Sequence, residues 1–149
     1  MRLSVLVVSR TAALINRLCE SLDAACSLAP IDGEIICSWN GSDVEEAQIR
    51  NSSRYDFHIA QRVPYHFATN MNSLAALAGG EVLMLANDDL ILDPGCVDAA
   101  MGLLRSRPNV GLVGALLRDT EGFLSHAGIN FDLRCSSYHL LDRVLPVER

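Results

Sequence analysis

A short apolar segment that ends in acidic residues constrains this sequence more than any other feature. Residues 82–86 (Val-Leu-Met-Leu-Ala) follow a glycine pair at 79–80 and run directly into Asn87, Asp88 and Asp89. A short apolar run between such breakers is typical of a strand buried on both faces. Ionised carboxylates resist burial unless they are paired, hydrogen-bonded or bound to a metal. The segment therefore predicts a buried strand whose carboxyl end offers oxygen ligands to a hard divalent cation.

Hydrophobic periodicity predicts that strands and helices alternate along the rest of the chain. We expect strands at 3–8, 34–39, 55–60, 82–86 and 110–117, and helices at 11–27, 42–50, 70–79 and 93–107. This alternation indicates an α/β fold with a mostly parallel, Rossmann-like sheet and helices on both faces. A turn at 119–122 predicts an antiparallel addition near the C-terminus.

Three polar residues are expected to begin helices. Ser42 and Glu45 have the spacing of a capping box, in which each side chain bonds the backbone of the other. Asn70 is expected to cap the helix that ends before residue 79. Asp93 is expected to cap the next helix, with Pro94 at its first position.

Composition limits the class of protein. At 149 residues the chain is expected to form a single domain, and half of its residues are hydrophobic, which is typical of a globular protein. The net charge of −6 predicts no nucleic-acid surface, and no apolar run is long enough to cross a membrane. All twelve basic residues are Arg, so lysine-dependent chemistry is excluded. Five cysteines without C-x-x-C spacing favour buried, reduced thiols in a cytoplasmic protein.

The candidate site residues each allow a structural interpretation. In an extended segment Asn87 and Asp89 share one face and Asp88 takes the other, but a polar turn after a strand has the same pattern. The segment 38–42 reads either as a turn with a helix cap or as a pocket wall, with Trp39 or Asn40 near a nucleotide base. Arg10 could bind a phosphate or simply be solvated. His126 could lie on the acceptor side of a site or be a structural residue.

Taken together, the segments resemble family 2 glycosyltransferases with a GT-A fold, and most of all bacterial rhamnosyl-type, O-antigen and capsule enzymes. The resemblance covers nearly the whole chain through segments in the family's order: 18–22, 34–36, 40–42, 65–68 with Asn72, 80–89, 111–115 and 122–128. It implies that the chain is the N-terminal, donor-binding part of such an enzyme, truncated at its C-terminal end.

The resemblance also implies roles for individual residues. Asp89 would bind the Mn²⁺ or Mg²⁺ ion that bridges the diphosphate of a nucleotide sugar. The donor itself would be bound by the side chains of Ser9, Arg10, Trp39, Asn40, Asn72, Asn87 and Asp88. Two positions depart from the family: Trp39 stands where an acidic residue usually meets the base, and the loop after the first strand is shortened to Ser9 and Arg10.

The expected function is binding of a nucleotide-diphosphate sugar through a divalent cation. The parent reaction would be inverting glycosyl transfer to a polysaccharide or lipid-linked acceptor. The family's general base lies beyond the matched segments, so no catalytic residue is assigned. An inactive chain is therefore compatible with the resemblance. The alternative is a non-catalytic nucleotide-sugar-binding or assembly domain. We expect a cytoplasmic location, and peripheral association with the inner membrane face is left open. The oligomeric state is not predicted.

Overall fold

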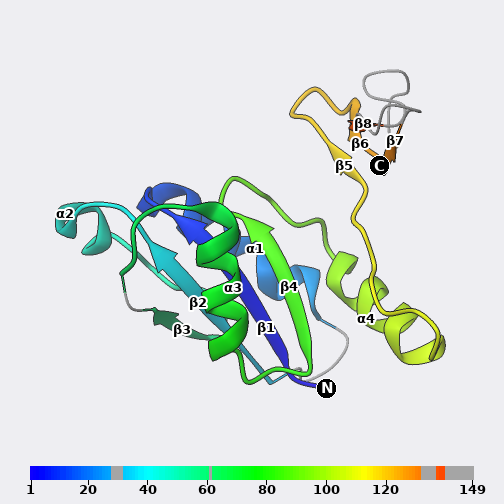
Figure 1. The fold of residues 1–149 in the computed structure, drawn as a ribbon, viewed down its shortest axis with the longest axis horizontal. Coiled ribbons are helices and arrows are strands. Elements are labelled where there is room, and N and C mark those ends of the chain that lie inside the picture. Colours follow the sequence, from blue (N-terminus) through cyan, green and yellow to red (C-terminus); the bar gives the residue numbers. More distant parts are fainter. Residues whose placement is uncertain (28–31, 61, 132–136, 140–149) are drawn as a thin grey trace. The chain divides into compact units, whose positions relative to one another are not determined.

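Four strands form the main sheet of the structure (Figure 1). The computed structural model describes residues 1–27, 32–60, 62–131 and 137–139. The elements are, in chain order, β1 (Leu3–Ser9), α1 (Ala12–Ala25), β2 (Gly33–Trp39), α2 (Asp43–Glu46), β3 (Asp56–Ile59), α3 (Phe67–Leu77), β4 (Val82–Asn87), α4 (Cys96–Ser106), β5 (Leu117–Arg118), β6 (Leu124–His126), β7 (Ile129–Phe131) and β8 (Ser137–His139). The chain divides into two compact units, residues 1–101 and 102–149, where the sequence predicts a single domain.

The strand order of the main sheet places β1 at a reversal of the chain. The order is β3-β2-β1-β4, and every neighbouring pair is parallel. The chain steps outward from β1 to β2 and β3, then returns past β1 to form β4. Such a reversal opens a crevice outside the carboxyl ends of the strands that flank it. The predicted mostly parallel sheet is confirmed. The prediction that the strand at 82–86 is buried on both faces is wrong, because Leu83 and Leu85 of β4 are 40% and 63% exposed.

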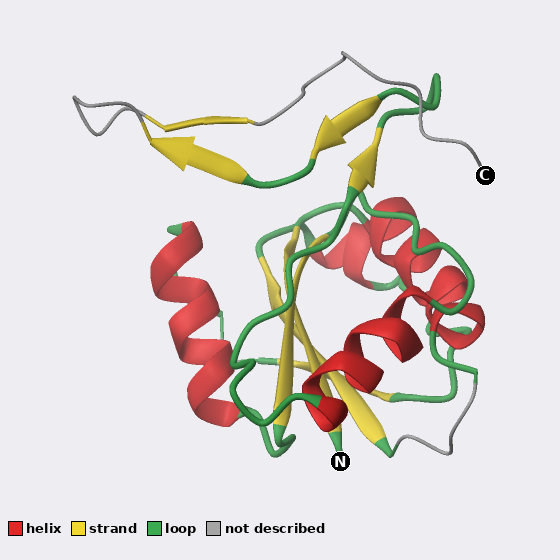
Figure 2. Ribbon diagram, turned by 90° about the vertical axis from the view of Figure 1, so that its right-hand side faces the viewer, coloured by secondary structure: helices red, strands yellow, loops and turns green. Residues whose placement is uncertain are grey.

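Helices cover both faces of this sheet, as expected for parallel strands (Figure 2). Leu6 and Ile36 pack with Met71 and Leu74 of α3 in one buried cluster. Helix α1 adds a buried stripe at helical spacing that includes Ile15, Leu18 and Leu22. All seven residues of β2 are buried, so the polar residues that follow it emerge only at the edge of the sheet.

The capping box at Ser42 is confirmed in one half only. The Ser42 hydroxyl accepts a hydrogen bond from the Glu45 backbone N–H at 3.2 Å. The Glu45 carboxylate does not return to Ser42, and instead accepts from the Ala12 N–H at 2.9 Å. Ala12 is the first residue of α1, and the N-cap Thr11 makes no side-chain cap of its own. Glu45 therefore caps a neighbouring helix, and α2 is shorter than predicted.

The predicted start of α3 at Asn70 is wrong. The helix begins at Phe67, and His66 is its N-cap, with its ring nitrogen accepting from the Thr69 N–H. Asn70 lies inside the first turn and is fully buried. Its Oδ1 accepts from the His66 N–H at 2.7 Å, and its Nδ2 donates to the Ser38 hydroxyl at 2.7 Å. The side chain thus caps the helix from within and ties α3 to β2.

The predicted start of α4 is wrong as well. The helix begins at Cys96 because Gly95 has a φ of +76°, a left-handed conformation that interrupts a right-handed helix. Further along, the strand expected at 110–117 is wrong for most of its length, because the regular strand β5 covers only Leu117–Arg118. Glycines at 111 and 114 weaken the strand pattern in the rest of that segment.

The antiparallel addition is confirmed within the second unit. Strands β5 and β6 pair antiparallel, as do β7 and β8. The turn between β5 and β6 is held by Asp119, whose Oδ1 accepts from the Glu121 and Phe123 N–H groups at 3.0 Å each. Gly122 completes the turn with a φ of +90°. The predicted turn at 119–122 is therefore present.

Free cysteines are mostly buried among the described residues. Cys19, Cys26 and Cys37 are buried, as predicted. Cys96 is exposed, so the prediction of a buried thiol is wrong for this residue. Cys135 lies outside the described residues. In the part of the chain that the structure describes, no helix combines the length and the apolar character needed to cross a bilayer.

A buried carboxylate network joins the amino ends of the central strands. Glu34 Oε1 accepts from the Ser4 hydroxyl at 2.6 Å and from the Gly79 N–H at 2.8 Å. The Ser4 hydroxyl in turn accepts from the Gly80 N–H at 2.9 Å, and Arg2 lies 3.6 Å from the carboxylate. The Ser4 hydrogen bond lowers the pKa of Glu34, aided by the Gly79 N–H and Arg2 and opposed by burial. Glu34 is thus held ionised inside the fold.

Replacing Ser4 with Ala should reduce the free energy of unfolding at neutral pH by about 1.5–3 kcal/mol, because a buried carboxylate loses a hydrogen bond. The native pKa of Glu34 is lowered, so the contribution is complete above its ordinary value of about 4.3 and is lost as the pH falls through the native pKa. Urea unfolding at neutral and acidic pH measures this. The exposed Ser73→Ala is the control, and a Ser4→Ala effect of equal size at both pH values would contradict the assignment.

Candidate functional site

A hydrogen bond between the ends of β1 and β4 organises the carboxyl edge of the sheet. The Ser9 hydroxyl donates to Asp88 Oδ2 at 2.6 Å. The parallel register brings them together, since Val8 lies opposite Asn87 and the next residue of each strand follows in step. Residues 79 positions apart in sequence therefore meet at the chain reversal. One oxygen of Asp88 is engaged by the protein, and the carboxylate is fixed in orientation.

Six of the described residues line a cavity of about 410 Å³ at this edge: Val8, Ser9, Arg10, Asn40, Tyr65 and Asp88. They come from the ends of β1, β2 and β4 and from the connection between β3 and α3. The Asn40 N–H donates to the Ser9 carbonyl at 2.8 Å, which joins two of these segments. The structure thus brings together four of the predicted donor-binding residues, namely Ser9, Arg10, Asn40 and Asp88.

Asn40 has an unsatisfied polar atom at the cavity wall. Its Nδ2 donates to the Val63 carbonyl at 3.1 Å, but its buried Oδ1 has no hydrogen-bond partner among the described residues. Buried polar atoms in folded proteins are nearly always satisfied by protein or by water. A free acceptor on a residue that lines a cavity is therefore consistent with a place where water or a ligand binds.

Trp39 does not line the cavity. Its side chain is 0% exposed, because β2 is buried along its whole length and the ring packs beneath Gly41. The indole nitrogen is buried without a hydrogen-bond partner among the described residues. Of the two predicted wall residues, the structure thus places Trp39 in the core and Asn40, which directly follows β2, at the cavity.

Arg10 is the only cationic residue among the described residues that line the cavity. It is exposed, and no ion pair or side-chain hydrogen bond ties it to another residue of the described ranges. The nearby N-terminus of α1 does not offer a vacant anion site, because Glu45 already accepts from Ala12 there. An anionic ligand in this cavity would therefore meet the guanidinium of Arg10.

The acidic residues after β4 separate as the alternation predicts. Asp88 is half-buried and faces the cavity, whereas Asn87 and Asp89 are exposed and are not among its lining residues. Burial raises the pKa of the neighbouring Cys37 thiol to about 12, with the charge of Asp88 adding to the effect. In the described residues no three His, Cys, Asp or Glu side chains cluster as a preformed metal site.

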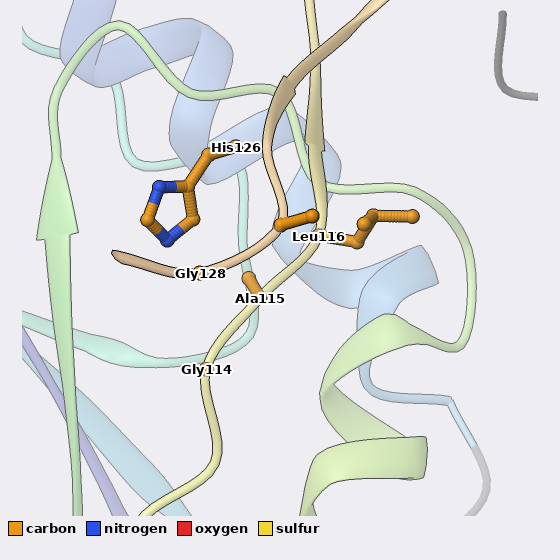
Figure 3. Close-up of a pocket in the computed structure, with 6 residues that line it drawn as sticks. Gly114, Ala115, Leu116, His126 and Gly128 are labelled. Atoms are coloured by element: carbon orange, nitrogen blue, oxygen red, sulfur yellow. The ribbon is translucent and has the colours of Figure 1, made fainter. Parts of the chain in front are cut away.

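Two other predicted residues are not among the lining residues of this cavity. Asn72 is exposed on α3 and is not among the lining residues. His126 belongs to the second unit, where it borders a separate pocket of about 190 Å³. Figure 3 shows that the side chains of His126 and Leu116 project away from each other at this pocket.

Sequence reasoning missed Val8 and Tyr65 as cavity residues. Val8 looks like any other residue of a buried strand, so nothing in its pattern marks it. Tyr65 carried a signal, because an aromatic residue after Pro64 precedes a helix in a connection that leaves the carboxyl edge. It is 69% exposed, which is unusual for so large a ring beside a cavity.

Comparison with known proteins finds relatives much longer than this chain. No protein-family model matches the sequence. The uncharacterized protein y4gI of Sinorhizobium fredii (strain NBRC 101917 / NGR234) is 34% identical over 102 residues, which are 64% of this chain and 11% of the relative. The O-antigen biosynthesis protein RfbC of Myxococcus xanthus is 36% identical over 67 residues, 44% of this chain and 5% of the relative. The chain thus spans about a tenth or less of these relatives.

Solved structures of Staphylococcus aureus TarS are similar in fold. TarS 1–349 superposes with a TM-score of 0.55 and 18% identity over 71% of this chain and 33% of that one. TarS 1–349 in complex with UDP gives a TM-score of 0.52 over 80% of this chain and 40% of that one. At this identity the likeness concerns the fold. The GT-A-like fold that the sequence resemblance implies is therefore confirmed.

Gly41→Ala should lower the free energy of unfolding by about 1–3 kcal/mol, because the added methyl would overpack a filled space. A Cβ at this position would lie 2.5 Å from the Arg10 carbonyl oxygen and would also overlap the Trp39 ring. Thermal unfolding followed by circular dichroism measures the change. The control is Gly102→Ala on α4, where a Cβ meets nothing within 4 Å and helix propensity favours Ala. Equal stability of the two variants would contradict the close approach at Gly41.

Proposed function

We propose that this chain is the donor-binding domain of a GT-A glycosyltransferase, which holds a nucleotide-diphosphate sugar at the carboxyl edge of its sheet. The observation that carries the proposal is the Ser9–Asp88 hydrogen bond beside Arg10, in one cavity at the chain reversal. Ligands of open α/β sheets bind at such reversals. The fold shared with TarS, which has been solved in complex with UDP, supports the same class of ligand.

Arg10 would bind the diphosphate. Its guanidinium carries five N–H donors in a planar fork that matches phosphate oxygens, and its charge is permanent. No carboxylate among the described residues competes for it by an ion pair. An anion entering the cavity would therefore gain a charge-assisted hydrogen bond without first breaking an internal one.

Asp88 would bind a sugar hydroxyl of the donor. Its Oδ2 accepts from Ser9, which leaves Oδ1 as the acceptor available to the cavity. A carboxylate fixed in this way can accept from a ribose hydroxyl without losing side-chain entropy on binding. Asn87, the last residue of β4, is exposed and does not line the cavity. Its side chain would have to reorient toward the cavity to contact the diphosphate.

A divalent cation fits the chemistry of the acidic residues. Asp89 is an exposed carboxylate next to Asp88, with no hydrogen bond or ion pair to another described residue. Mg²⁺ commonly takes one or two carboxylates and completes its shell with phosphate oxygens and water. Asp89 would hold the cation in this way once the diphosphate is present. When bound, the cation would stabilise the negative charge that grows on the departing nucleotide diphosphate.

The parent reaction we propose is inverting transfer of the sugar to a polysaccharide or lipid-linked acceptor. The name of RfbC, an O-antigen biosynthesis protein, supports an acceptor of this class. Inverting transfer needs a general base that deprotonates the acceptor hydroxyl. Of the residues that the structure describes, Asp88 is the only carboxylate that lines the cavity, and it is engaged by Ser9. The base would therefore come from a part of the enzyme other than these lining residues.

That same observation favours a second candidate, a non-catalytic domain that binds nucleotide sugar for assembly or regulation. The cavity has the groups to hold a donor, but among its described lining residues Asp88 and Tyr65 are the only ones with an acid–base side chain that could act as the base. Isothermal titration and a donor-hydrolysis assay on one preparation separate the two functions. Metal-dependent release of sugar from the bound donor would support the enzyme, and tight binding without any release would support the binding domain.

Arg10→Gln should weaken UDP binding by roughly 10- to 100-fold, with or without metal, because it removes a charge-assisted hydrogen bond to phosphate. Isothermal titration calorimetry measures the affinity. Arg17→Gln, an exposed arginine on α1, is the matched control and should leave the affinity unchanged. Equal binding by the wild type and Arg10→Gln would remove Arg10 from the site.

Asp89→Asn should weaken UDP binding only in the presence of Mn²⁺, because the amide retains an oxygen but loses the charge that attracts the cation. Titrations of UDP with Mn²⁺ and with a chelator give the metal-dependent part of the affinity. Asp56→Asn, an exposed carboxylate at the start of β3, is the control. A wild-type affinity that does not respond to Mn²⁺, or a full response in Asp89→Asn, would overturn the cation site.

A further inference from the structure

Tyr65 is an exposed aromatic residue at a cavity whose other polar groups suit phosphate and sugar. The side chain is 69% exposed, while Trp39, the aromatic residue at the end of the adjacent β2, is completely buried. The lining residues Arg10, Asp88 and Ser9 offer a cation, a carboxylate and a hydroxyl. Tyr65 is therefore the one planar apolar surface among the six lining residues.

The backbone on both sides of Tyr65 is held in place. Two residues before it, the Val63 carbonyl accepts from Asn40 Nδ2 at 3.1 Å. One residue after it, the His66 N–H donates to Asn70 Oδ1 at 2.7 Å. Asn70 is 0% exposed and is itself bonded to Ser38 of β2. The exposed ring thus stands on a segment that is anchored to the core at two points.

Proline restricts this segment further. Pro64 immediately precedes Tyr65 and has a fixed φ near about −65°, so the chain has less freedom to turn the ring away from the cavity. A ring on an anchored backbone has only two side-chain torsions left to order when a ligand binds. Such an aromatic residue contributes contact area at a small entropic loss.

We propose that Tyr65 forms the face on which the nucleobase of the donor stacks. This inference rests on the proposed function and names the residue that binds the base. A heterocyclic base has two flat faces and a polar edge, and stacking on an aromatic ring requires no particular edge. Arg10 and Asp88 meet the charged and hydroxylated parts of the ligand, and the Tyr65 ring meets the remaining planar part. The role expected of Trp39 thus falls to a residue from a different connection.

Binding of UDP and of inorganic pyrophosphate to Tyr65 variants tests this proposal. Tyr65→Ala should weaken UDP binding by roughly 5- to 150-fold, the range of base–aromatic stacking, and leave pyrophosphate binding unchanged. Tyr65→Phe keeps the ring and should bind UDP as the wild type does. Phe67→Ala is the matched control, because Phe67 is a nearby exposed aromatic residue (47%) that does not line the cavity.

Each outcome either supports the stacking role or overturns it. Unchanged UDP binding by Tyr65→Ala overturns it and leaves the proposed function intact. Equal losses for UDP and pyrophosphate overturn it as well, because they indicate a displaced loop. Tyr65→Phe binding as weakly as Tyr65→Ala would assign the contact to the hydroxyl and not to the ring. A folded wild-type protein that binds no UDP at all would instead overturn the proposed function, and this inference with it.

Discussion

The pairing of β1 with β2 on one side and β4 on the other determines where the polar residues of this chain can meet. Because all three strands are parallel, their carboxyl ends share one edge, and the register brings Ser9 level with Trp39 and next to the residue after Asn87. The interiors of β1 and β2 are apolar and buried, so the first polar side chains emerge together at that edge. Shifting β4 by one residue would turn Asp88 away from Ser9 and would turn the exposed Leu83 and Leu85 to the opposite face of the sheet. The polar cavity therefore depends on this register.

Elements with strong hydrophobic periodicity could be predicted from sequence because the pattern depends on residues that are close together in the chain. The run at 82–86 forms a strand and the stripe through Leu18 and Leu22 forms a helix, as expected, but the strand is not buried on both faces, because Leu83 and Leu85 are exposed. Helix starts were predicted less well because the polar residues that mark them choose among several partners in three dimensions. Glu45 caps a different helix, and Asn70 bonds backward to His66 and across to Ser38. The strand expected at 110–117 failed for a related reason, since apolar residues interrupted by glycines form a strand only where a partner strand is present.

The residues of the candidate site also divide into those that sequence could predict and those that it could not. Ser9, Arg10, Asn40 and Asp88 follow directly from the ends of predicted parallel strands, and the structure places them around one cavity. Trp39 differs because the last residue of a strand points either out of the sheet edge or into a layer, and sequence does not distinguish these directions. Tyr65 differs because the position of a long connection depends on its anchors, Asn40 to Val63 and His66 to Asn70. These contacts join segments that no local pattern relates.

The charges around the cavity give a physical reason for a cation at this site. In many α/β folds the N-terminus of the first helix binds phosphate through its free N–H groups. In this structure the Glu45 carboxylate bonds to the first residue of α1, so a negative charge stands where a phosphate would otherwise gain from the helix. Among the described residues that line the cavity, Arg10 is the one cationic side chain and Asp88 is the one carboxylate, and Asp89 follows Asp88 in sequence. A nucleotide diphosphate carries more negative charge than Arg10 alone can offset, and the cation that we propose on Asp89 would offset the rest. Arg10 would orient the diphosphate, and the cation would supply the larger part of the attraction.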